Sequence, residues 1–487
     1  MKSPARFTPR LRCSEFFLIC VALLSLAMLL PALGVRDPFF ARLRPTLFYC
    51  IAAYSSVTSI ILALMLWRHR VFAPHYSGTA PRRLAIVWLL IATIAVGIFA
   101  HSAEGRHSAA RAFVLNPVRK AALHRIGEHL IVGYRDPAFV FELIEHDAIG
   151  GVFITHHNVR ERAIPQIRNE IAGFQARRKL LGRPPLWIAT DQEGGSVSRL
   201  SPPLERQPFL SALLPPAFEG NMDGNPGSWT RSAALAQRLR EHGAAQGVAL
   251  ADLGVNVNFS PVVDLRVPAR EKTDSAMGWL DAFSRIETRA IHRDPRVVAF
   301  AAGEYARGLL QNGVYPTLKH FPGLGRLAAD THWFAAALPD GPATLRKHDW
   351  HPFRSLGVAL PRASRAAMIP WIMLGHAHVP GIDPRYPASH SEKIVRGLLR
   401  EAWKYDGVLI TDDMNMRPII LGDGGMGGAA VRALNADVDL LLISYDGENV
   451  YPVLGALLTA DRRGALDPAA LQRSAGRLRR ARLARTD

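Results

Sequence analysis

The sequence predicts an all-α membrane region followed by an α/β barrel of the TIM type, and three observations indicate this fold class. Three long apolar segments occupy the first 116 residues, eight short apolar runs follow them, and amphipathic stretches separate many of the short runs. Short buried strands that alternate with helices form parallel sheets, and eight such units close into a barrel. We therefore expect a membrane region at 1–116 and a barrel at 117–487, connected through Ser102–Val118.

The three apolar segments have nearly the length that crosses a bilayer. They cover about 16–35, 47–67 and 84–100, and a hydrocarbon core of about 30 Å requires roughly 20 helical residues. Taken alone, the first segment could be a signal peptide, because basic residues precede it. No small-x-small cleavage site follows, so an uncleaved anchor is expected. The region is expected to be a multi-pass domain of the inner (cytoplasmic) membrane and to bind the lipid bilayer.

The orientation of the barrel follows from the number of spans and from the basic N-terminus. Three spans place the two ends of the chain on opposite sides of the membrane, and basic residues before the first span favour a cytoplasmic start. The loops on the two sides carry almost equal numbers of basic residues, which therefore give little information about the orientation. We therefore expect a periplasmic or extracellular barrel, with a cytoplasmic barrel as the second hypothesis.

Short apolar runs and helical stretches alternate along the rest of the chain. The eight predicted strands are His129–Tyr134, Gly151–Thr155, Leu186–Thr190, Val255–Phe259, Tyr315–Leu318, Ala366–Ile369, Val408–Thr411 and Asp439–Ile443. Five stretches with apolar residues at helical spacing are Glu161–Arg178, Trp229–Leu250, Pro295–Gln311, Lys393–Lys404 and Gly427–Ala436.

Polar side chains follow several of these strands directly. In parallel barrels, the carboxyl ends of the strands carry the active site. The sequence therefore predicts a polar rim that contains Asp191, Gln192, Glu193, Asp264, Lys319, His320, His376, His378 and Asp412.

Asp330 and His332 lie on the segment that leaves the fifth predicted strand. A carboxylate two residues before an imidazole can fix its tautomer and keep it charged enough to protonate a leaving group. Such a pair is often an ordinary surface loop, and Asp412 could equally be a helix N-cap after its strand. The presence of both features favours a proton-transfer site.

Five motifs occur in one order along about residues 117–487, and together they resemble glycoside hydrolase family 3, particularly its β-N-acetylhexosaminidase branch. That branch acts on the amino sugars of bacterial cell-wall fragments. The motifs are Asp191–Gly195, Asn258–Asp264, Lys319–Gly323, Asp330–His332 and Thr411–Met416.

The resemblance implies a role for each matching residue. Asp412 would be the nucleophile and His332 the general acid/base, with Asp330 orienting His332. A retaining glycosidase needs such a carboxylate and such a proton donor and acceptor. Asp413 is the second candidate for the nucleophile, because two adjacent carboxylates could both face the sugar in a substrate-assisted mechanism. The residues that would hold the sugar are Asp191, Arg199, Arg289, Lys319 and His320.

The chain departs from the family pattern at four places. Leu324 replaces a histidine, Ser196 replaces a basic residue, and an insertion covers about 266–285. The fourth departure is the glycine-rich loop Gly422–Gly428. The favoured function is a membrane-anchored exo-glycosidase that releases terminal β-linked N-acetylhexosamine from peptidoglycan fragments. A β-glucosidase of the same family and a catalytically silent glycan-binding barrel are the alternatives.

Two other motifs have competing interpretations. Gly422–Gly427 spells a dinucleotide fingerprint, but its acidic residue comes too early and no second βαβ half surrounds it. His376 and His378 could be metal ligands, but no matching partners stand at other strand ends. We therefore expect neither a cofactor nor a metal.

Composition limits the partners. A formal net charge of +18 favours contact with anionic surfaces, such as phospholipid headgroups or acidic wall polymers. The basic residues are dispersed and no recognition motif accompanies them, so no nucleic-acid partner is expected. All three cysteines lie in the membrane region, and disulfides therefore cannot reveal the compartment of the barrel.

Overall fold

The computed structural model describes residues 13–72, 80–215, 232–267, 285–327, 330–359 and 368–486. The chain divides into two compact units, Met1–Ala112 and Phe113–Asp487. The expected insertion at about 266–285 lies almost entirely outside the described residues, as do the first three residues of the stretch Trp229–Leu250.

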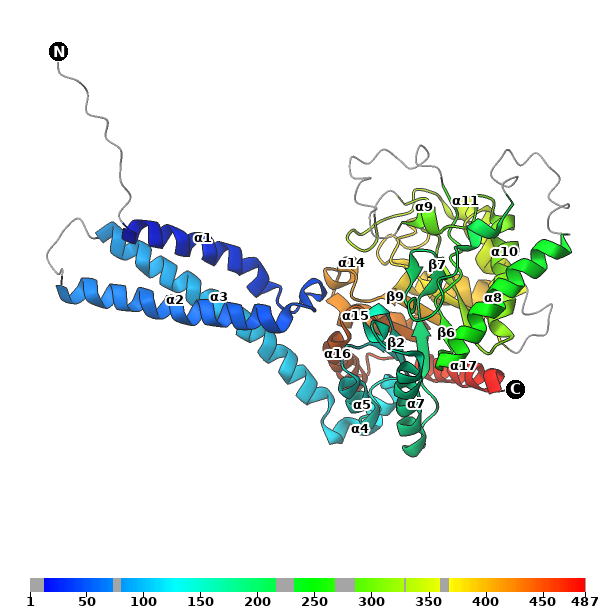
Figure 1. Cartoon of the computed structure of the whole chain (residues 1–487), viewed down its shortest axis with the longest axis horizontal. Helices are drawn as coiled ribbons and strands as arrows, with labels where there is room; N and C mark the ends of the chain where they lie inside the picture. Colours follow the sequence, from blue (N-terminus) through cyan, green and yellow to red (C-terminus); the bar gives the residue numbers. More distant parts are fainter. Residues whose placement is uncertain are drawn as a thin grey trace, which may run out of the picture. The chain divides into compact units, whose positions relative to one another are not determined.

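The first unit consists of long apolar helices. They are α1 (Cys13–Leu33), α2 (Arg44–Phe72) and α3 (Ala80–Val114), with the short η1 (Pro38–Phe40) between the first two (Figure 1). Each contains a stretch long and apolar enough to cross a membrane, as the sequence predicts. Most of the expected connection, Ser102–Val118, is helical, because α3 continues as far as Val114.

The helices of this unit pack through small apolar clusters and a few polar contacts. The Ser55 hydroxyl donates to the Thr93 carbonyl at 2.7 Å, and the Ser25 and Tyr54 hydroxyls lie 2.7 Å apart. Many large apolar side chains nevertheless point outward, and the side chain of Leu30 is 76% exposed. This outward apolar surface is typical of helices that meet lipid or another apolar partner.

The second unit is a closed barrel of eight parallel strands, as predicted. Around the barrel the strands follow the order β1, β10, β9, β8, β7, β6, β3, β2. The strands are β1 (Leu130–Gly133), β2 (Gly151–Ile154), β3 (Trp187–Thr190), β6 (Val257–Asn258), β7 (Tyr315–Phe321), β8 (Trp371–Leu374), β9 (Leu409–Asp413) and β10 (Leu440–Ile443). A separate antiparallel hairpin, β4 (Gln192–Gly194) with β5 (Val197–Ser198), follows β3.

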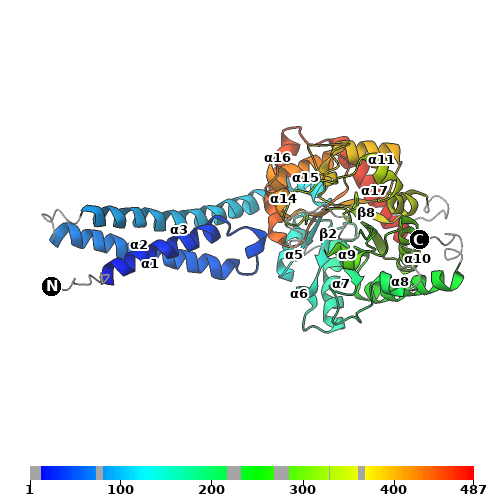
Figure 2. The same cartoon turned by 90° about the horizontal axis from the view of Figure 1, so that it is seen from above.

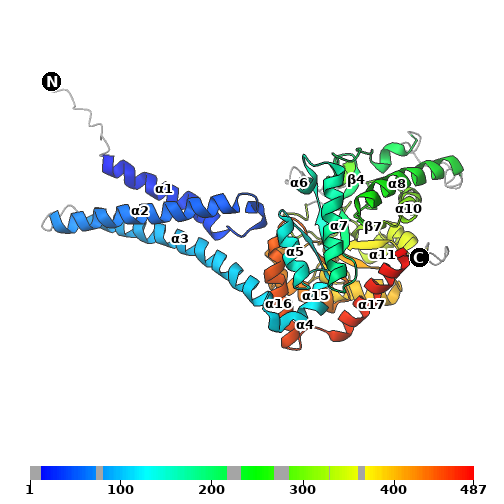
Figure 3. The ribbon, with the colours of Figure 1, turned by 60° about the horizontal axis from the view of Figure 1, so that its bottom comes forward.

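Helices surround the strands on the outside of the barrel (Figures 2 and 3). Several begin with a proline or with a polar cap, such as Asp294, which accepts the Arg296 N–H at the start of α10. The longer ones are α4 (Lys120–Gly127), α5 (Pro137–Glu145), α7 (Ile164–Leu180), α8 (Ala233–Leu253), α10 (Pro295–Leu310), the π-helix η10 (Lys393–Ala402), α15 (Gly425–Asn435), α16 (Val450–Arg462) and α17 (Pro468–Thr486). The short helices α6 (His156–Val159), α9 (Ile286–Arg289), α11 (Pro342–Lys347), α12 (His351–Arg354) and α14 (Arg417–Ile420) lie in the connections.

Aromatic side chains fill the amino end of the barrel. Trp187, Tyr315 and Trp371 are the first residues of β3, β7 and β8, and each is at most 1% exposed. The rings of Trp187 and Trp371 meet edge to face with centroids 5.0 Å apart. The polar rim that the sequence predicts lies at the opposite, carboxyl end of the strands.

The prediction of a strand at Ala366–Ile369 is wrong. The strand is Trp371–Leu374, which is fully buried and pairs with β7 and β9; residues 366 and 367 lie outside the described residues. Pro370 interrupts the apolar run that the prediction followed, and it has no N–H to donate to a neighbouring strand. The strand therefore begins after the proline.

The dinucleotide interpretation of Gly422–Gly427 is excluded by its surroundings. The apolar residues before it form helix α14, not a strand. A phosphate-binding loop of that type requires a strand on one side and a helix on the other. This segment therefore connects two helices, α14 and α15.

Asp439, which directly precedes β10, connects three elements at the amino end of the barrel. Its carboxylate is fully buried and accepts the Arg400 Nη2 at 2.6 Å, the Arg477 Nε at 2.8 Å and the Leu409 N–H at 2.8 Å. Arg400 lies on η10 and Arg477 on α17, while Leu409 begins β9. Because both guanidinium groups are also largely buried, each charge depends on the others for its compensation.

We expect Asp439→Ala to lower the free energy of unfolding by about 3 to 5 kcal/mol, because the buried Arg400 would lose its carboxylate partner and the buried Arg477 would keep only its longer contact with Asp437. Denaturant unfolding of the detergent-solubilised full chain measures this change. Asp461→Ala is the matched control, since Asp461 pairs with Arg125 at an exposed position and should cost less than about 1 kcal/mol. Equal losses in the two variants would contradict the assigned importance of Asp439.

Candidate active site

The carboxyl ends of the strands bring most of the predicted residues to one rim. Asp191 follows β3 directly, Lys319 and His320 lie within β7, and Asp412 lies within β9. Parallel closure of the barrel is the reason that these distant positions in the sequence share one face.

Two cations and two carboxylates form a compact cluster at this rim. The Lys319 ammonium lies 2.5 Å from an oxygen of Asp191 and 2.5 Å from an oxygen of Glu193. Arg289 donates two hydrogen bonds to Glu193, from Nη2 at 2.6 Å and from Nε at 2.9 Å. Lys319 and Glu193 are at most 3% exposed, so the four charges compensate one another away from water.

The electrostatics of Glu193 and Arg289 follow from this pairing. Burial raises the pKa of the Glu193 carboxyl, but the charges of Arg289 and Lys319 and their hydrogen bonds outweigh burial and hold this pKa far below its usual range. For Arg289, burial lowers the pKa of the guanidinium, whereas Glu193 raises it above its ordinary value. Both groups are therefore ionised. The sequence places Glu193 in the polar rim and in the Asp191–Gly195 motif, but its pairing with Arg289 and Lys319 was not predicted.

His320 is fixed by Asp264. The Nδ1 of His320 lies 2.7 Å from Asp264 Oδ2, and the same carboxylate accepts the His320 N–H at 3.1 Å and the Leu324 N–H at 2.7 Å. Asp264 is almost completely buried. With Nδ1 directed at the carboxylate, Nε2 is the nitrogen that can meet a ligand. Leu324, which departs from the family pattern, is itself buried and contributes its backbone to this arrangement.

Asp412 and Asp413 have very different surroundings, although they are adjacent. Asp413 accepts hydrogen bonds on both oxygens, from the backbone and side chains of Asn415 and Ser444 and from the N–H of Tyr445, at 2.7 to 3.1 Å. Among the described residues, the carboxylate of Asp412 accepts one hydrogen bond, from the Asp413 N–H at 2.8 Å. Asp413 therefore anchors the loop after β10, and the Asp412 carboxylate is available for a ligand.

Three histidines influence the pKa of Asp412. Burial raises the pKa of the Asp412 carboxyl, but His320, His376 and His332, together with the Asp413 N–H, outweigh burial and lower the pKa. Asp412 is therefore ionised near neutral pH.

His332 and Asp330 form the pair that their spacing predicts. The Nδ1 of His332 lies 2.6 Å from Asp330 Oδ1, and the same oxygen accepts the His332 N–H at 2.8 Å. Asp330 is buried, whereas the His332 side chain is 44% exposed. Burial lowers the pKa of His332, but the hydrogen bond and charge of Asp330 and the charge of Asp412 outweigh it and raise the pKa. The imidazole can therefore hold a proton close to Asp412 near neutral pH.

His376 is a buried structural neighbour of this pair. Its Nε2 donates to the Asp413 carbonyl at 3.0 Å, and its Nδ1 accepts the hydroxyl of Ser389 at 2.8 Å. Burial lowers its pKa, although Asp412 and Asp413 oppose this change. Both ring nitrogens are engaged, and no group of three potential ligands that could hold a metal occurs within the part of the chain that the structure describes.

Arg199 is not part of the charged cluster. Its side chain is exposed, and its backbone N–H donates to the Asp191 carbonyl at 3.2 Å. Ser196, where the family pattern has a basic residue, is also exposed on the hairpin. Of the five predicted sugar-binding residues, Asp191, Lys319, Arg289 and His320 therefore lie in the buried part of the rim, while Arg199 lies at its surface.

The chain is similar to a known protein family and to several named bacterial proteins. The family model described as "Glycosyl hydrolase family 3 N terminal domain" matches residues 123–481. "Beta-hexosaminidase" from Pseudomonas aeruginosa (strain LESB58) is 31% identical over 343 residues, which are 69% of this chain and 86% of that protein. "Beta-hexosaminidase LpqI" from Mycobacterium tuberculosis is 31% identical over 362 residues, which are 73% of this chain and 81% of that protein.

Solved structures also resemble this chain. A glycoside hydrolase family 3 beta-N-acetylglucosaminidase from Paenibacillus sp. str. FPU-7 matches with a TM-score of 0.62 and 28% identity over 75% of this chain. The match covers 62% of the Paenibacillus chain, so this protein spans less than two thirds of that relative. The structure of M. tuberculosis LpqI matches with a TM-score of 0.58 and 29% identity, over 76% of this chain and 94% of that one.

We expect Asp330→Asn to lower the pKa of His332, because a neutral amide cannot stabilise the imidazolium as the carboxylate does. A pKa that is raised in the folded protein means that His332 keeps its proton to higher pH, and the variant should lose it at lower pH. Titration of the ring resonances in histidine-labelled protein measures the change, and His332→Gln identifies the signal. An unchanged pKa would show that Asp330 does not set the charge of His332.

Proposed function

Because the chain belongs to glycoside hydrolase family 3, as its motifs predicted, we propose that this glycoside hydrolase releases terminal β-linked N-acetylhexosamine from glycans. N-Acetylglucosamine in peptidoglycan fragments is the proposed natural substrate. The observation that carries this proposal is the available carboxylate of Asp412, with the Asp330–His332 pair beside it. The names of the similar proteins, beta-hexosaminidase and beta-N-acetylglucosaminidase, support the same substrate class.

In the proposed mechanism, Asp412 is the nucleophile. Its ionised carboxylate attacks the anomeric carbon, the bond to the leaving group breaks, and a covalent glycosyl-enzyme forms. The lowered pKa of Asp412 keeps it ionised for this step. Asp413 is less suited to attack, because both of its oxygens accept hydrogen bonds from the protein. The substrate-assisted alternative that uses both carboxylates is therefore disfavoured.

His332 is the proposed general acid and then the general base. Its raised pKa lets it carry a proton to the departing oxygen in the first step. After departure, the neutral imidazole removes a proton from water as the water attacks the glycosyl-enzyme. Asp330 orients the ring through Nδ1, so the exchanged proton is the one on Nε2.

The charged cluster is the proposed sugar-binding part of the site. Carboxylate oxygens of Asp191 can accept hydrogen bonds from sugar hydroxyls, while Lys319 and Arg289 can donate to hydroxyl or acetamido oxygens. His320 would present Nε2 to the same ligand. Arg199 would act from the surface of the rim, where its exposed side chain can close on a bound sugar.

The substrate class is tested with aryl glycosides and the detergent-solubilised full chain. We expect hydrolysis of 4-nitrophenyl N-acetyl-β-glucosaminide and at least tenfold slower hydrolysis of the corresponding β-glucoside. Asp412→Ala should lower kcat for both by about 10³-fold or more, because no covalent intermediate can form. Preference for the glucoside would indicate a β-glucosidase, and binding of the glycan without turnover would indicate a silent barrel. Retention of activity by Asp412→Ala would show that Asp412 is not the nucleophile.

His332→Ala should discriminate between leaving groups. Turnover of substrates with poor leaving groups should fall strongly, because these groups need a proton to depart. The rate of the first step with a 2,4-dinitrophenyl glycoside should fall much less. Pre-steady-state measurement of phenol release separates this step from hydrolysis of the intermediate. Equal losses for good and poor leaving groups would contradict the role of His332 as the general acid.

We also propose that the three N-terminal helices anchor the enzyme in the cytoplasmic membrane, with the barrel in the periplasm or outside the cell. The length and apolar character of α1, α2 and α3 and their outward-facing leucines support the anchor. The basic residues before α1 support a cytoplasmic start. Cell-wall glycan lies on the side where three spans would then place the barrel.

Topology is testable with alkaline phosphatase, which is active only after export. We expect a fusion after residue 120 to be active and a fusion within residues 68–83 to be inactive, since the latter loop should face the cytoplasm. Immunoblots of both fusions control for expression. The reverse pattern would place the barrel in the cytoplasm without affecting its proposed chemistry.

A further inference from the structure

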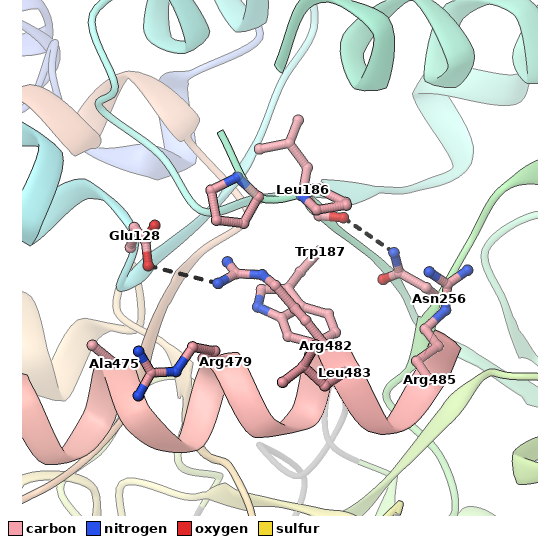
Figure 4. A pocket seen from close by; sticks show the side chains of 11 residues that line it. Glu128, Leu186, Trp187, Asn256, Ala475, Arg479, Arg482, Leu483 and Arg485 are labelled. Atoms are coloured by element: carbon pink, nitrogen blue, oxygen red, sulfur yellow. Dashed lines mark hydrogen bonds and ion pairs between the residues drawn. The ribbon is translucent and has the colours of Figure 1, made fainter. Parts of the chain in front are cut away.

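A cavity lies at the amino end of the barrel, away from the rim that carries Asp412. Its volume is about 440 Å³. Its walls come from the residues at the start of β3, from the segments before β1 and β6, and from helix α17 (Figure 4). A volume between about 300 and 1,000 Å³ is typical of sites that hold small molecules. The glycosidase mechanism makes no use of this cavity.

Arg482 is the innermost charged group of the cavity. Its side chain is 13% exposed, and its guanidinium lies 3.6 Å from the Glu128 carboxylate (Figure 4). The Nε and Nη2 atoms of Arg482 are buried and have no hydrogen-bond partner among the described residues. Buried donors of a cation that stay unsatisfied are costly. Glu128 therefore compensates only part of this guanidinium, and the exposed part of the side chain can meet an oxyanion in the cavity.

Trp187 adds an aromatic wall with a donor of its own. The guanidinium carbon of Arg482 lies 5.2 Å from the centroid of the Trp187 ring, and the indole is 1% exposed. Its Nε1 is also buried, without a hydrogen-bond partner in the part of the chain that the structure describes. Leu186 lies in the wall of the cavity (Figure 4), and Pro184 also lines it. The cavity therefore combines a partly compensated guanidinium with an apolar wall.

Two further arginines give the cavity a positive charge. Arg479 and Arg485 lie on the same helix as Arg482, three positions before and three positions after it, and both are exposed. The Nε of Arg485 donates to the Gly313 carbonyl at 2.9 Å, which fixes this side chain. Glu128 is the single acidic residue of the lining, against three arginines. This charge balance attracts anions to the opening.

We propose that this cavity binds a small organic oxyanion, a carboxylate or phosphate joined to an apolar or aromatic body. The oxyanion would accept hydrogen bonds from Arg482, whose planar guanidinium suits both groups. The body would lie against the proline and leucine side chains that line the cavity beside Trp187. Binding here does not depend on the proposed glycosidase activity, because the cavity is formed at the opposite ends of the strands.

Isothermal titration calorimetry of the full chain in detergent, at low ionic strength, tests the proposal. The probes are phenyl phosphate and benzoate, with inorganic phosphate and neutral benzyl alcohol for comparison. We expect saturable binding of phenyl phosphate, benzoate or both, at least tenfold tighter than either comparison compound. Which of the two binds better distinguishes a phosphate ligand from a carboxylate ligand.

Variants locate the binding site. Arg482→Gln should weaken binding at least tenfold, and Arg479→Gln, which changes an exposed residue and should fold normally, should weaken it about threefold. Arg480→Gln is the matched control, because Arg480 is on the same helix but pairs with Asp406 at the surface; its affinity should be unchanged. Absence of binding, equal affinity for inorganic phosphate, or equal losses in the Arg480 variant would each overturn the proposal.

Discussion

The Lys319 ammonium between two carboxylates is the interaction on which the candidate active site depends. Lys319 lies in β7, and both Asp191 and Glu193 follow β3. A buried ammonium without partners would be strongly destabilising, so this lysine and the two carboxylates must stay together. Arg289 neutralises the second carboxylate. The cluster has no net charge, and a neutral sugar can therefore replace water at this rim without leaving an uncompensated charge.

This fixed cluster also separates residues that hold the site from residues that can react. Asp264 and Asp413 are used entirely for positioning: the first fixes His320 and the turn at Leu324, and the second fixes the loop after β10. Asp412 and His332 keep more freedom, since one has a single hydrogen bond among the described residues and the other is partly exposed. Reactive groups are expected where the surrounding residues are rigid but the groups themselves are accessible.

The sequence predicts the barrel well because buried parallel strands are short, continuous apolar runs. Runs such as Gly151–Ile154 and Leu440–Ile443 are fully buried in the structure. The sixth strand was misplaced because the apolar run extends on both sides of Pro370, and only pairing with β7 and β9 decides which side is the strand. Local pattern cannot contain that information, since pairing involves residues far away in the sequence.

The site was predictable where a motif carries the chemistry in a few adjacent residues, as in Asp330 and His332. It was less predictable where function depends on a partner distant in the sequence. Glu193 gains its importance from Arg289, which is 96 positions away, and Arg199 has a suitable residue type but an exposed position. The different surroundings of Asp412 and Asp413 likewise require Ser444, which follows another strand.

The amino end of the barrel stabilises the fold, and the carboxyl end carries the candidate active site. At the amino end, Asp439 joins two arginines and the start of β9, and the rings of Trp187, Tyr315 and Trp371 close the interior. This rigid end stabilises the fold, which lets the carboxyl end hold buried charges that contribute little to stability by themselves. The cavity beside Trp187 lies against that rigid end, and its walls are therefore already formed before any ligand arrives. Little reorganisation would oppose binding there, because the ring of Trp187 is held by its aromatic neighbours.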